Sequence, residues 1–323
     1  MDVLEAEARV RANDHAKFRS LVARAQQHAP LKVAVAHPCD QVSLESAAAA
    51  ASLKLIAPIL VGPEERIRTV AAEHGIDVSG FEIVDADYSQ DSAEKAVALV
   101  REGRAEALMK GSLHTDELMG AVVKRDTGLR TARRISHCFV MDVPDHDQPL
   151  IISDAAVNIA PDLKAKVDIT QNAIDLAHAL GQKEVRVAVL SAMESVNPDV
   201  PSTLEAAALC KMADRGQITG ALMDGPLALD NAISPEAAAI KKISSPVAGR
   251  ASVLIVPDLE AGNMLAKSLS FLADADAAGI VLGAKVPIIL TSRADEETAR
   301  LASCAVAQLM AASRRSSASA AIQ

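Results

Sequence analysis

The stretch LKVAVAHPCDQVSLESAAAAASLKLIAPILVGP (residues 31–63) decides the fold class, because it reads as a strand, a helix and a second strand in succession. The apolar runs 31–38 and 55–63 each end in a turn, and the segment 43–53 between them is rich in alanine. Strands that alternate with helices are typical of a parallel sheet covered on both faces. The sequence therefore predicts an α/β protein.

Outward from this stretch, the same alternation continues along the chain. We expect an amphipathic helix over 2–29, and a last helix over 295–313 that ends in a frayed Ser/Ala/Arg tail. Asp91 or Ser92 is predicted to cap one helix, and Ser202-Thr203 another. The other predicted helices are 64–75, 91–105, 163–180 and 202–215, and the other predicted strands are 81–86, 106–111, 150–158, 185–192, 218–226, 252–259, 279–284 and 287–294.

The region 126–150 interrupts this alternation of strands and helices. It contains a basic cluster, an apolar strand and a loop rich in Pro, Asp and His. Such a change in composition indicates the end of one domain, so we place a domain boundary near this loop.

Composition and charge exclude several classes of function. The 323 residues carry a formal net charge of −9 and include no tryptophan, one tyrosine and four phenylalanines. Nucleic-acid binding needs a basic footprint, and platforms for single-stranded nucleic acids need aromatic faces. We therefore expect small-molecule partners, with no nucleic acid and no membrane among them.

The cysteines and the N-terminus indicate the cellular compartment. Cys39, Cys138, Cys210 and Cys304 are dispersed and form no CxxC pair, which is typical of reduced thiols in a cytosolic protein. The N-terminus has no apolar segment typical of a signal peptide, and the longest apolar runs are too short to span a bilayer. The sequence predicts a soluble, cytoplasmic protein.

Ligands of parallel sheets gather at the carboxyl ends of the strands, so the polar residues after the apolar runs are the candidates for a site. Any one such stretch is more often ordinary turn chemistry. Several together predict a cleft that holds an anion through backbone N–H groups and hydroxyls. The five stretches are KGSLHT (110–115), SDAAVN (153–158), SAMES (191–195), DGPLALDNAIS (224–234) and TSRAD (291–295).

Arginines near these stretches favour a phosphate as the anion, because a guanidinium binds phosphate through two parallel hydrogen bonds. Arg130, Arg133 and Arg134 form one cluster, and Arg293 follows Ser292 at the end of an apolar run. The cluster is explained equally well as a solvated face or as an interface with ion pairs. Arg293 is the stronger candidate for binding phosphate, because it lies at the end of a buried strand.

Other catalytic patterns are absent from the sequence. No GxGxxG motif follows the first predicted strand, no GxSxG motif occurs, and GIVLGAKV (279–286) has too short a glycine spacing for a P-loop. His37 and Cys39, like His114 and Asp116, lack partners for a zinc site. We expect no metal and no bound cofactor.

Six long stretches resemble the phosphate acetyltransferase and phosphate butyryltransferase family, over about residues 30 to 310. Two of them, with the forms MKGSLHT and GLRT…ISH, also look like the acyltransferase part of bifunctional enoyl-CoA hydratase/phosphate acetyltransferase proteins. The stretches are LMKGSLHTDELM, GLRTARRISHCFVMDVP, AVLSAMESVNP, STLEAAALCKMADRGQITGALMDGPLALDNAIS, SPVAGRASVLIVPDLEAGNMLAKSL and PIILTSRAD.

The resemblance implies a fold like that of isocitrate and isopropylmalate dehydrogenases, with two α/β domains and the active site in the cleft between them. The first domain is then discontinuous and comprises residues 1–148 and 292–323, while residues 149–291 form the second domain. The family is typically homodimeric, so we expect a homodimer with the second domain at the interface.

The activity that the resemblance implies is reversible transfer of a short acyl group between coenzyme A, as a substrate, and inorganic phosphate. The coenzyme A thiolate attacks the acyl-phosphate carbonyl directly, and fixed donors stabilise the oxyanion and the leaving phosphate. Both substrates must be held together in one complex. Acetyl is the expected group, with propionyl and butyryl as the alternatives.

The family's motifs place a catalytic centre near the end of the chain. Ser292 and Arg293 match the family's Ser-Arg pair, which stabilises the transition state and binds the phosphoryl group. The spacing of the family's catalytic aspartate falls on Ala299, which is a departure from the pattern. Asp295 is therefore the candidate base.

Other site residues follow from the resemblance with less direct matches. Asp224 and Asp154 are alternative bases, and Arg130 or Arg134 would bind coenzyme A because Met119 stands where acetyltransferases carry an arginine. Asn263 orders the cleft or caps a loop. The candidate substrate-binding residues are Lys110, Gly111, Ser112, His114, Thr115, Arg130, Arg134, Asp154, Asn158, Ser191, Glu194, Asp224, Gly225, Pro226 and Asn263.

Two other classes of protein are open alternatives. A metal- and NAD-dependent hydroxyacid dehydrogenase on the same fold would need a paired Tyr and Lys, and Tyr88, the one tyrosine, lies outside any motif. A non-catalytic regulator that binds coenzyme A or acyl phosphate would explain the departure at Ala299. The retained Ser292-Arg293 pair argues against it, and a turnover assay separates the two.

Overall fold

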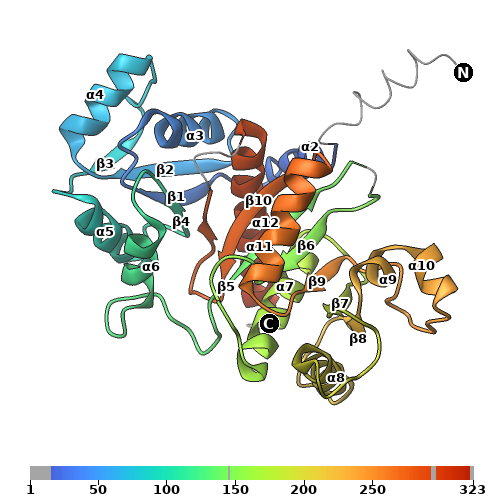
Figure 1. Cartoon of the computed structure of the whole chain (residues 1–323). Helices are drawn as coiled ribbons and strands as arrows, with labels where there is room; N and C mark the ends of the chain where they lie inside the picture. Colours follow the sequence, from blue (N-terminus) through green and yellow to red (C-terminus); the bar gives the residue numbers. More distant parts are fainter. Residues whose placement is uncertain (1–15, 145, 292–295, 321–323) are drawn as a thin grey trace, which may run out of the picture. The chain divides into compact units, whose positions relative to one another are not determined.

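The structure, a computed structural model, describes residues 16–144, 146–291 and 296–320 of the chain. The chain divides into two compact units (Figure 1). Unit 1 comprises Met1–Leu21 and Cys138–Ala277, and unit 2 comprises Val22–His137 and Ala278–Gln323. Each unit is therefore made of two segments that lie far apart in the sequence.

The sheet of unit 2 is built around β1 (Leu31–Ala36), which pairs in parallel with β2 (Ile56–Val61) on one side and with β4 (Ala107–Lys110) on the other. β3 (Glu82–Val84) follows β2, and β11 (Ile288–Ile289) follows β4, both in parallel. β1 and β2 are buried at every position except the second. Near-continuous burial is the reason why these strands appear in the sequence as unbroken apolar runs.

Helices lie on both sides of these strands. Figure 1 shows α3 (Gln41–Ser52) and α4 (Glu64–His74) on one side, and α5 (Ser89–Arg101) and α6 (Thr115–Val123) on the other. The alanines on the buried face of α3 allow close packing of helix on sheet. α12 (Glu297–Ala320) contacts α3 and is buried along most of its first four turns by alanine, valine and leucine side chains.

The sheet of unit 1 has β6 (Leu150–Ser153) between β5 (Ser136–Asp142), which is antiparallel to it, and β9 (Val253–Ile255), which is parallel. β7 (Arg186–Leu190) pairs with β9, and β8 (Leu222–Leu227) pairs with β7, both in parallel. The core of this unit is aliphatic. Its helices are α7 (Leu163–Ala179), α8 (Pro201–Asp214), α9 (Leu229–Ile233), α10 (Pro235–Ile240) and α11 (Leu259–Leu272).

The described part of the predicted N-terminal helix is α2 (Ala16–Ala25). Lys17 and Phe18 of α2 are bonded to the buried Asp142 at the end of β5. Lys17 Nζ donates to Asp142 Oδ1 at 2.8 Å, and the backbone N–H of Phe18 donates to Oδ2 at 3.0 Å. One carboxylate thereby pairs the lysine and accepts a backbone N–H group of the helix.

The predicted α/β class is confirmed, with two corrections to its details. The sheet is not parallel throughout, because β10 (Asp276–Leu282) runs antiparallel to β11 and β5 runs antiparallel to β6. Both connections are short turns or loops, which can join antiparallel strands but not parallel ones. The prediction also missed the helices α6, α9, α10 and α11.

Two predicted helix caps are wrong. α5 begins at Ser89 after Tyr88, and Asp91 and Ser92 lie inside its first turn. α8 begins at Pro201, before the Ser-Thr pair, because a proline suits the first helical position, where its missing N–H costs nothing.

The predicted domain boundaries, at 148/149 and 291/292, stay a prediction. The compact units change near these positions, at 137/138 and 277/278.

Candidate functional site

In unit 2, the loops that follow β1 and β4 are bonded to each other. The Ser112 hydroxyl and N–H both donate to the His37 carbonyl, at 2.8 and 2.9 Å, and the Gly111 N–H donates to the Ala36 carbonyl at 2.9 Å. A Cβ atom on Gly111 would lie 2.4 Å from the Ala36 carbonyl oxygen, so only glycine fits there. The predicted KGSLHT stretch is thus held against the end of the neighbouring strand.

His37 has a left-handed backbone conformation, with φ of 57°. Its buried ring places Nδ1 3.0 Å from the Ser92 hydroxyl of α5. Burial lowers the pKa of His37, and the nearby Arg66 lowers it further. The imidazole is therefore neutral around pH 7. Through Ser92 it connects the loop after β1 to α5.

A small pocket lies at these strand ends. Lys110 and Gly111 line it from β4, and Thr291 lines it directly after β11. Arg300 of α12 contributes a second cationic side chain. Two cations together with hydroxyl groups form an environment that suits a phosphoryl group. The other lining residues are Asp40, Val42, Ser43, Ser46 and Met109.

Asp40 caps α3 beside this pocket. Its carboxylate accepts the Ser43 N–H at 2.9 Å and caps the helix, so the first turn of α3 starts beside β4. The hydroxyls of Ser43 and Ser46 donate to backbone carbonyls of the preceding turn. Of the two cations that line the pocket, Lys110 donates its Nζ to the Gly111 carbonyl of its own loop at 3.2 Å.

The three predicted catalytic residues, Ser292, Arg293 and Asp295, lie outside the described residues. Thr291, on the wall of the small pocket, directly precedes them in the chain.

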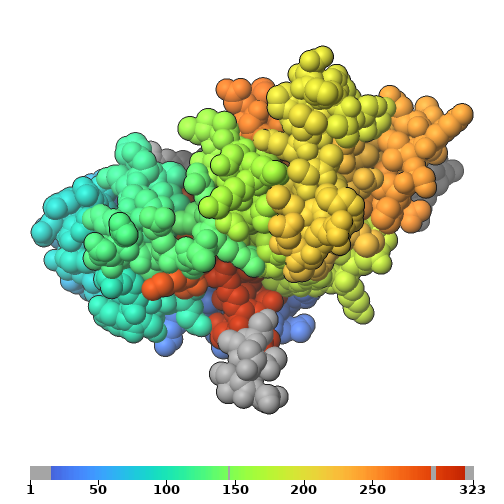
Figure 2. Space-filling view, turned by 90° about the horizontal axis from the view of Figure 1, so that it is seen from below, coloured from blue at the N-terminus to red at the C-terminus, as the bar shows by residue number. Residues whose placement is uncertain are grey.

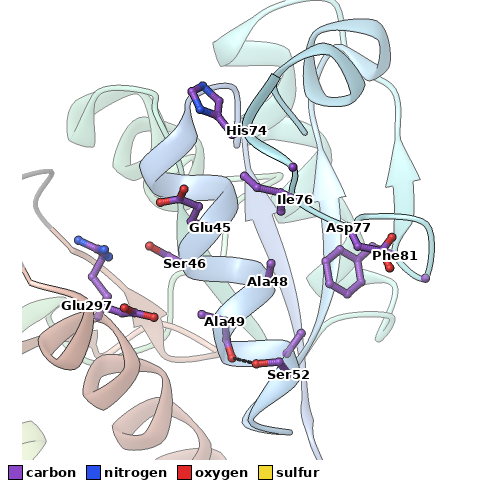
Figure 3. A pocket seen from close by; sticks show the side chains of 14 residues that line it. Glu45, Ser46, Ala48, Ala49, Ser52, His74, Ile76, Asp77, Phe81 and Glu297 are labelled. Atoms are coloured by element: carbon purple, nitrogen blue, oxygen red, sulfur yellow. Dashed lines mark hydrogen bonds between the residues drawn. The ribbon is translucent and has the colours of Figure 1, made fainter. Parts of the chain in front are cut away.

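A larger groove of about 860 Å³ runs along the outer side of α3 and shares Ser46 and Arg300 with the small pocket (Figure 3). Glu45, Asp77 and Glu297 give this groove an acidic lining. Carboxylates repel an anionic ligand, so the small pocket, which has one carboxylate (Asp40) and a volume of about 10 Å³, is the better marker of the candidate site.

The end of the KGSLHT stretch serves to start a helix. The N–H of His114 donates to Glu117 Oε2 at 2.7 Å, and Glu117 also accepts the Ser89 hydroxyl. This bond from Ser89 is the main cause of the lowered pKa of Glu117. Thr115 is the first residue of α6, and both His114 and Thr115 are exposed outside the small pocket.

The predicted arginine cluster lies on the segment between α6 and β5, which is at the surface in green in Figure 2. Arg130 and Arg134 are exposed. Their backbone packs on the turn at Gly283, whose carbonyl accepts the Thr131 hydroxyl at 2.6 Å. The structure does not bring these arginines into the small pocket.

In unit 1, the SDAAVN stretch is bonded to itself. The buried carboxylate of Asp154 accepts the N–H groups of Ala156, Val157 and Asn158 at 3.0–3.2 Å, and it also accepts the Asn158 side-chain amide. Four donors saturate the two oxygens. This geometry favours a structural role for Asp154 and Asn158 over proton transfer.

The remaining unit 1 candidates are also engaged within the unit. Glu194 pairs with Lys241 at 3.0 Å, which lowers its pKa, and the Ser191 hydroxyl lies 2.9 Å from that of Ser202. Asp224 Oδ1 accepts the Gly225 N–H at 2.8 Å, directly before Pro226 in β8.

Asn263 lies inside α11 and not in a loop. Its side-chain amide donates to the Ala155 carbonyl at 3.3 Å. The neighbouring Gly262 allows this close approach, because a Cβ there would lie 3.0 Å from the Ala155 Cα.

None of the four cysteines fits the role of a thiolate nucleophile. Burial raises the pKa of Cys39 to about 11 and those of Cys138, Cys210 and Cys304 to about 12. A thiol with such a pKa is almost fully protonated at neutral pH.

Within residues 16–144, 146–291 and 296–320, no three His, Cys, Asp or Glu side chains are grouped so that they could hold a metal ion. In the same part of the chain, no helix is long and apolar enough to cross a bilayer.

Sequence reasoning found Lys110 and Gly111 but missed Asp40, Ser46 and Arg300, the side chains that helices bring to the pocket. An acidic residue before an alanine-rich run is a helix-cap signal that could have identified Asp40. Nothing local to Arg300 could have identified it, because its place depends on how α12 packs.

Residues 87–308 match the family model described as phosphate acetyl/butaryl transferase. A phosphate acetyltransferase from Rhizobium meliloti is 64% identical over 306 residues, which cover 95% of this chain and 97% of the relative. A phosphate butyryltransferase from Clostridium acetobutylicum is 40% identical over 297 residues, which cover 92% and 99%.

Solved structures agree with this match. A branched-chain phosphotransacylase from Enterococcus faecalis V583 superimposes with a TM-score of 0.77 at 30% identity, over 87% of this chain and 99% of the other. A 4-hydroxythreonine-4-phosphate dehydrogenase from Burkholderia phymatum has a TM-score of 0.52 at 13% identity, over 88% and 98%. The second match bears on the fold alone, and it confirms the predicted dehydrogenase-like architecture.

Proposed function

The chain belongs to the phosphate acetyl/butyryl transferase family, and from this premise we propose that it is a phosphate acetyltransferase. Transfer of an acyl group between coenzyme A and phosphate is the activity of this family. The observation that carries the choice of acetyl is the 64% identity to a phosphate acetyltransferase, against 40% to a phosphate butyryltransferase. Inorganic phosphate, acyl phosphate and coenzyme A are then the small-molecule substrates.

The proposed reaction uses a base of the protein and two substrates, and it needs no cofactor. The coenzyme A thiol loses its proton to a base, and the thiolate attacks the carbonyl carbon of acetyl phosphate. The new carbon–sulfur bond forms as the bond from carbon to the phosphate oxygen breaks, and the electron pair leaves with the phosphate. The products are acetyl-CoA and inorganic phosphate.

Ser292 and Arg293 are the proposed donors to the transition state. Hydrogen bonds to charge that develops only in the transition state contribute about 3 kcal/mol each. Their position in the chain, directly after Thr291 on the pocket wall, supports this role.

Asp295 is the proposed base, in the same segment. Asp224 ranks next, because its Oδ1 accepts the backbone N–H of Gly225 and the residue is partly exposed. Asp154 ranks last, because four donors occupy its carboxylate.

We propose that the phosphoryl group binds beside the small pocket of unit 2, which at about 10 Å³ is too small to enclose it. Lys110 and Arg300 supply charge that matches a phosphate dianion. The buried thiols support direct attack by coenzyme A over a covalent acyl-cysteine. The four cysteines are free thiols, and this supports a location in the reducing cytoplasm.

We further propose that the working form is a homodimer that associates through unit 1, as the family resemblance implies.

A competition experiment tests the choice of acetyl. Purified protein receives coenzyme A and equimolar acetyl, propionyl and butyryl phosphate, and the three thioesters are separated by chromatography. We expect acetyl-CoA to form at least about tenfold faster than butyryl-CoA, since each extra methylene in a fitted pocket costs about 1–3 kcal/mol. Faster formation of butyryl-CoA would make the chain a butyryltransferase. No thioester at all would favour the non-catalytic regulator.

A further inference from the structure

In unit 2, the chain leaves the sheet at Leu290 by passing over the face of Gly279. The antiparallel ladder of β10 and β11 runs as far as the pair Ile280 and Ile289. A Cβ atom on Gly279 would lie 2.6 Å from the Leu290 carbonyl oxygen, which is closer than a carbon atom and a carbonyl oxygen can approach. The path of the chain at Leu290 therefore requires glycine at position 279.

His137 of β5 packs into the same space. Its buried ring places Nε2 3.1 Å and Cε1 3.7 Å from the position that a Cβ atom of Gly279 would take. The imidazole and the Leu290 carbonyl thus share the room that the missing side chain leaves. Because protein interiors are close-packed, the ring limits how far the Leu290 peptide can move across the strand.

α12 is bonded to the same glycine. The Gly279 N–H donates to the buried Ser303 hydroxyl at 3.1 Å, and this hydroxyl donates to the Ala299 carbonyl at 3.0 Å. In the chain, Leu290 comes shortly before the proposed catalytic pair, and α12 begins shortly after it. Gly279 is therefore in contact with the described residues on both sides of the proposed catalytic segment.

We propose that Gly279 and His137 are positioning residues for acyl transfer, because they set the path of the chain into Ser292 and Arg293. This inference rests on the proposed function and adds two residues to it. Groups that stabilise a transition state must be held in place closely, and a misplacement of about 1 Å can cost about a hundredfold in rate. Neither residue has to touch a substrate to have this effect.

A matched control separates positioning from a loss of stability. Gly128, on the segment between α6 and β5, is also crowded by main-chain atoms, since a Cβ atom there would lie 2.3 Å from the carbonyl oxygens of Val122 and Lys124. Gly128→Ala therefore introduces a clash of the same kind away from Leu290. We expect both alanine variants to lose stability, and only Gly279→Ala to lose rate in the folded state.

The first test is the rate of acetyl-CoA formation, at a temperature where circular dichroism shows every variant to be folded. Gly279→Ala should lower kcat about a hundredfold and His137→Ala about tenfold, with each KM within about twofold of the wild-type value. Gly128→Ala should leave kcat unchanged. The double variant of Gly279 and His137 should lose no more than Gly279→Ala alone, because both changes act on the same peptide.

The second test needs no acyl transfer. Trypsin cleaves after arginine, so the release of a fragment that ends at Arg293, measured by mass spectrometry, reports access to the proposed catalytic segment. Gly279→Ala should speed this cleavage about tenfold relative to the wild-type protein, and Gly128→Ala should not. A wild-type protein without turnover would contradict the proposed reaction alone, because the cleavage rates still test the path of the chain.

Three results would overturn the proposal. Equal values of kcat in Gly279→Ala, Gly128→Ala and the wild-type protein would show that the path at Leu290 does not govern the rate. Losses of the two single variants that multiply in the double variant would show that Gly279 and His137 act separately. Cleavage after Arg293 at the wild-type rate in Gly279→Ala would show that the glycine does not set the path of this segment.

Discussion

Two strand-end loops that look alike in sequence behave differently in the two units. KGSLHT, after β4 in unit 2, presents Lys110 and Gly111 to a pocket, while the carboxylate of Asp154 in unit 1 is turned inward and bonded to its own loop. Both stretches are small, polar and placed where ligands of α/β sheets gather. A polar strand end therefore indicates a site only when its side chains also line a pocket, as Lys110 does while its Nζ donates to the Gly111 carbonyl at 3.2 Å.

The largest effect that follows from this comparison is on stability, at the inward-facing loop. Asp154→Ala should lower the free energy of unfolding by about 3 kcal/mol, because it leaves the buried N–H of Asn158 and two part-buried N–H groups without their acceptor. Urea denaturation followed by circular dichroism measures this change. Asp154→Asn, which keeps one carbonyl acceptor, should lose less, and an alanine variant as stable as wild type would show that the loop does not depend on its carboxylate.

The next effect is on turnover, at the segment that continues from the pocket. Arg293→Ala should reduce the rate of acetyl-CoA formation about a hundredfold or more, since it removes a donor to the transition state. Thermal unfolding of the variant is the control for an intact fold. Wild-type rates in a folded variant would remove Arg293 from the mechanism.

A smaller effect is expected on substrate binding at the outward-facing loop. Lys110→Met should raise the KM for inorganic phosphate about tenfold, with little change in stability, because one charged contact is lost at the pocket surface. Lys95→Met, which removes a surface lysine paired with Asp91 in the same unit, is the matched control and should change neither. A rise in the KM for coenzyme A alone would mean that Lys110 contacts the other substrate.

The smallest effect is on the pH dependence of stability, at His37 in the loop after β1. Burial lowers the pKa of His37 in the folded state, so the unfolded state binds a proton more readily as the pH falls below about 6.5. Wild-type stability should therefore decline from pH 7.5 to 5.5 by more than that of His37→Asn, since asparagine tolerates the left-handed backbone but does not titrate. Parallel declines in the two proteins would show that His37 is not the titrating group.

The fold was largely predictable because its strands are buried along nearly their whole length. The apolar runs at 31–38 and 55–63 contain β1 and β2 for that reason. α11 was missed although Asp258 caps it by accepting the Ala261 N–H at 2.8 Å, because the exposed Met264 and Phe271 mask the usual polar face.

The site was predictable only in part. Lys110 and Gly111 follow a strand, so their position was implied by the order of elements along the chain. Arg300 reaches the same pocket from a helix almost 200 residues later, and that meeting depends on tertiary packing. Asp154 was selected on residue type, and only the structure shows the donors that occupy it.

The most direct test of the account is the rate at which purified protein makes acetyl-CoA from acetyl phosphate and coenzyme A in the presence of a chelator. We expect steady turnover, of about 1–1,000 per second as is usual for enzymes, that the chelator does not change and that inorganic phosphate inhibits as a product. An absence of thioester with acetyl, propionyl and butyryl phosphate alike would contradict it.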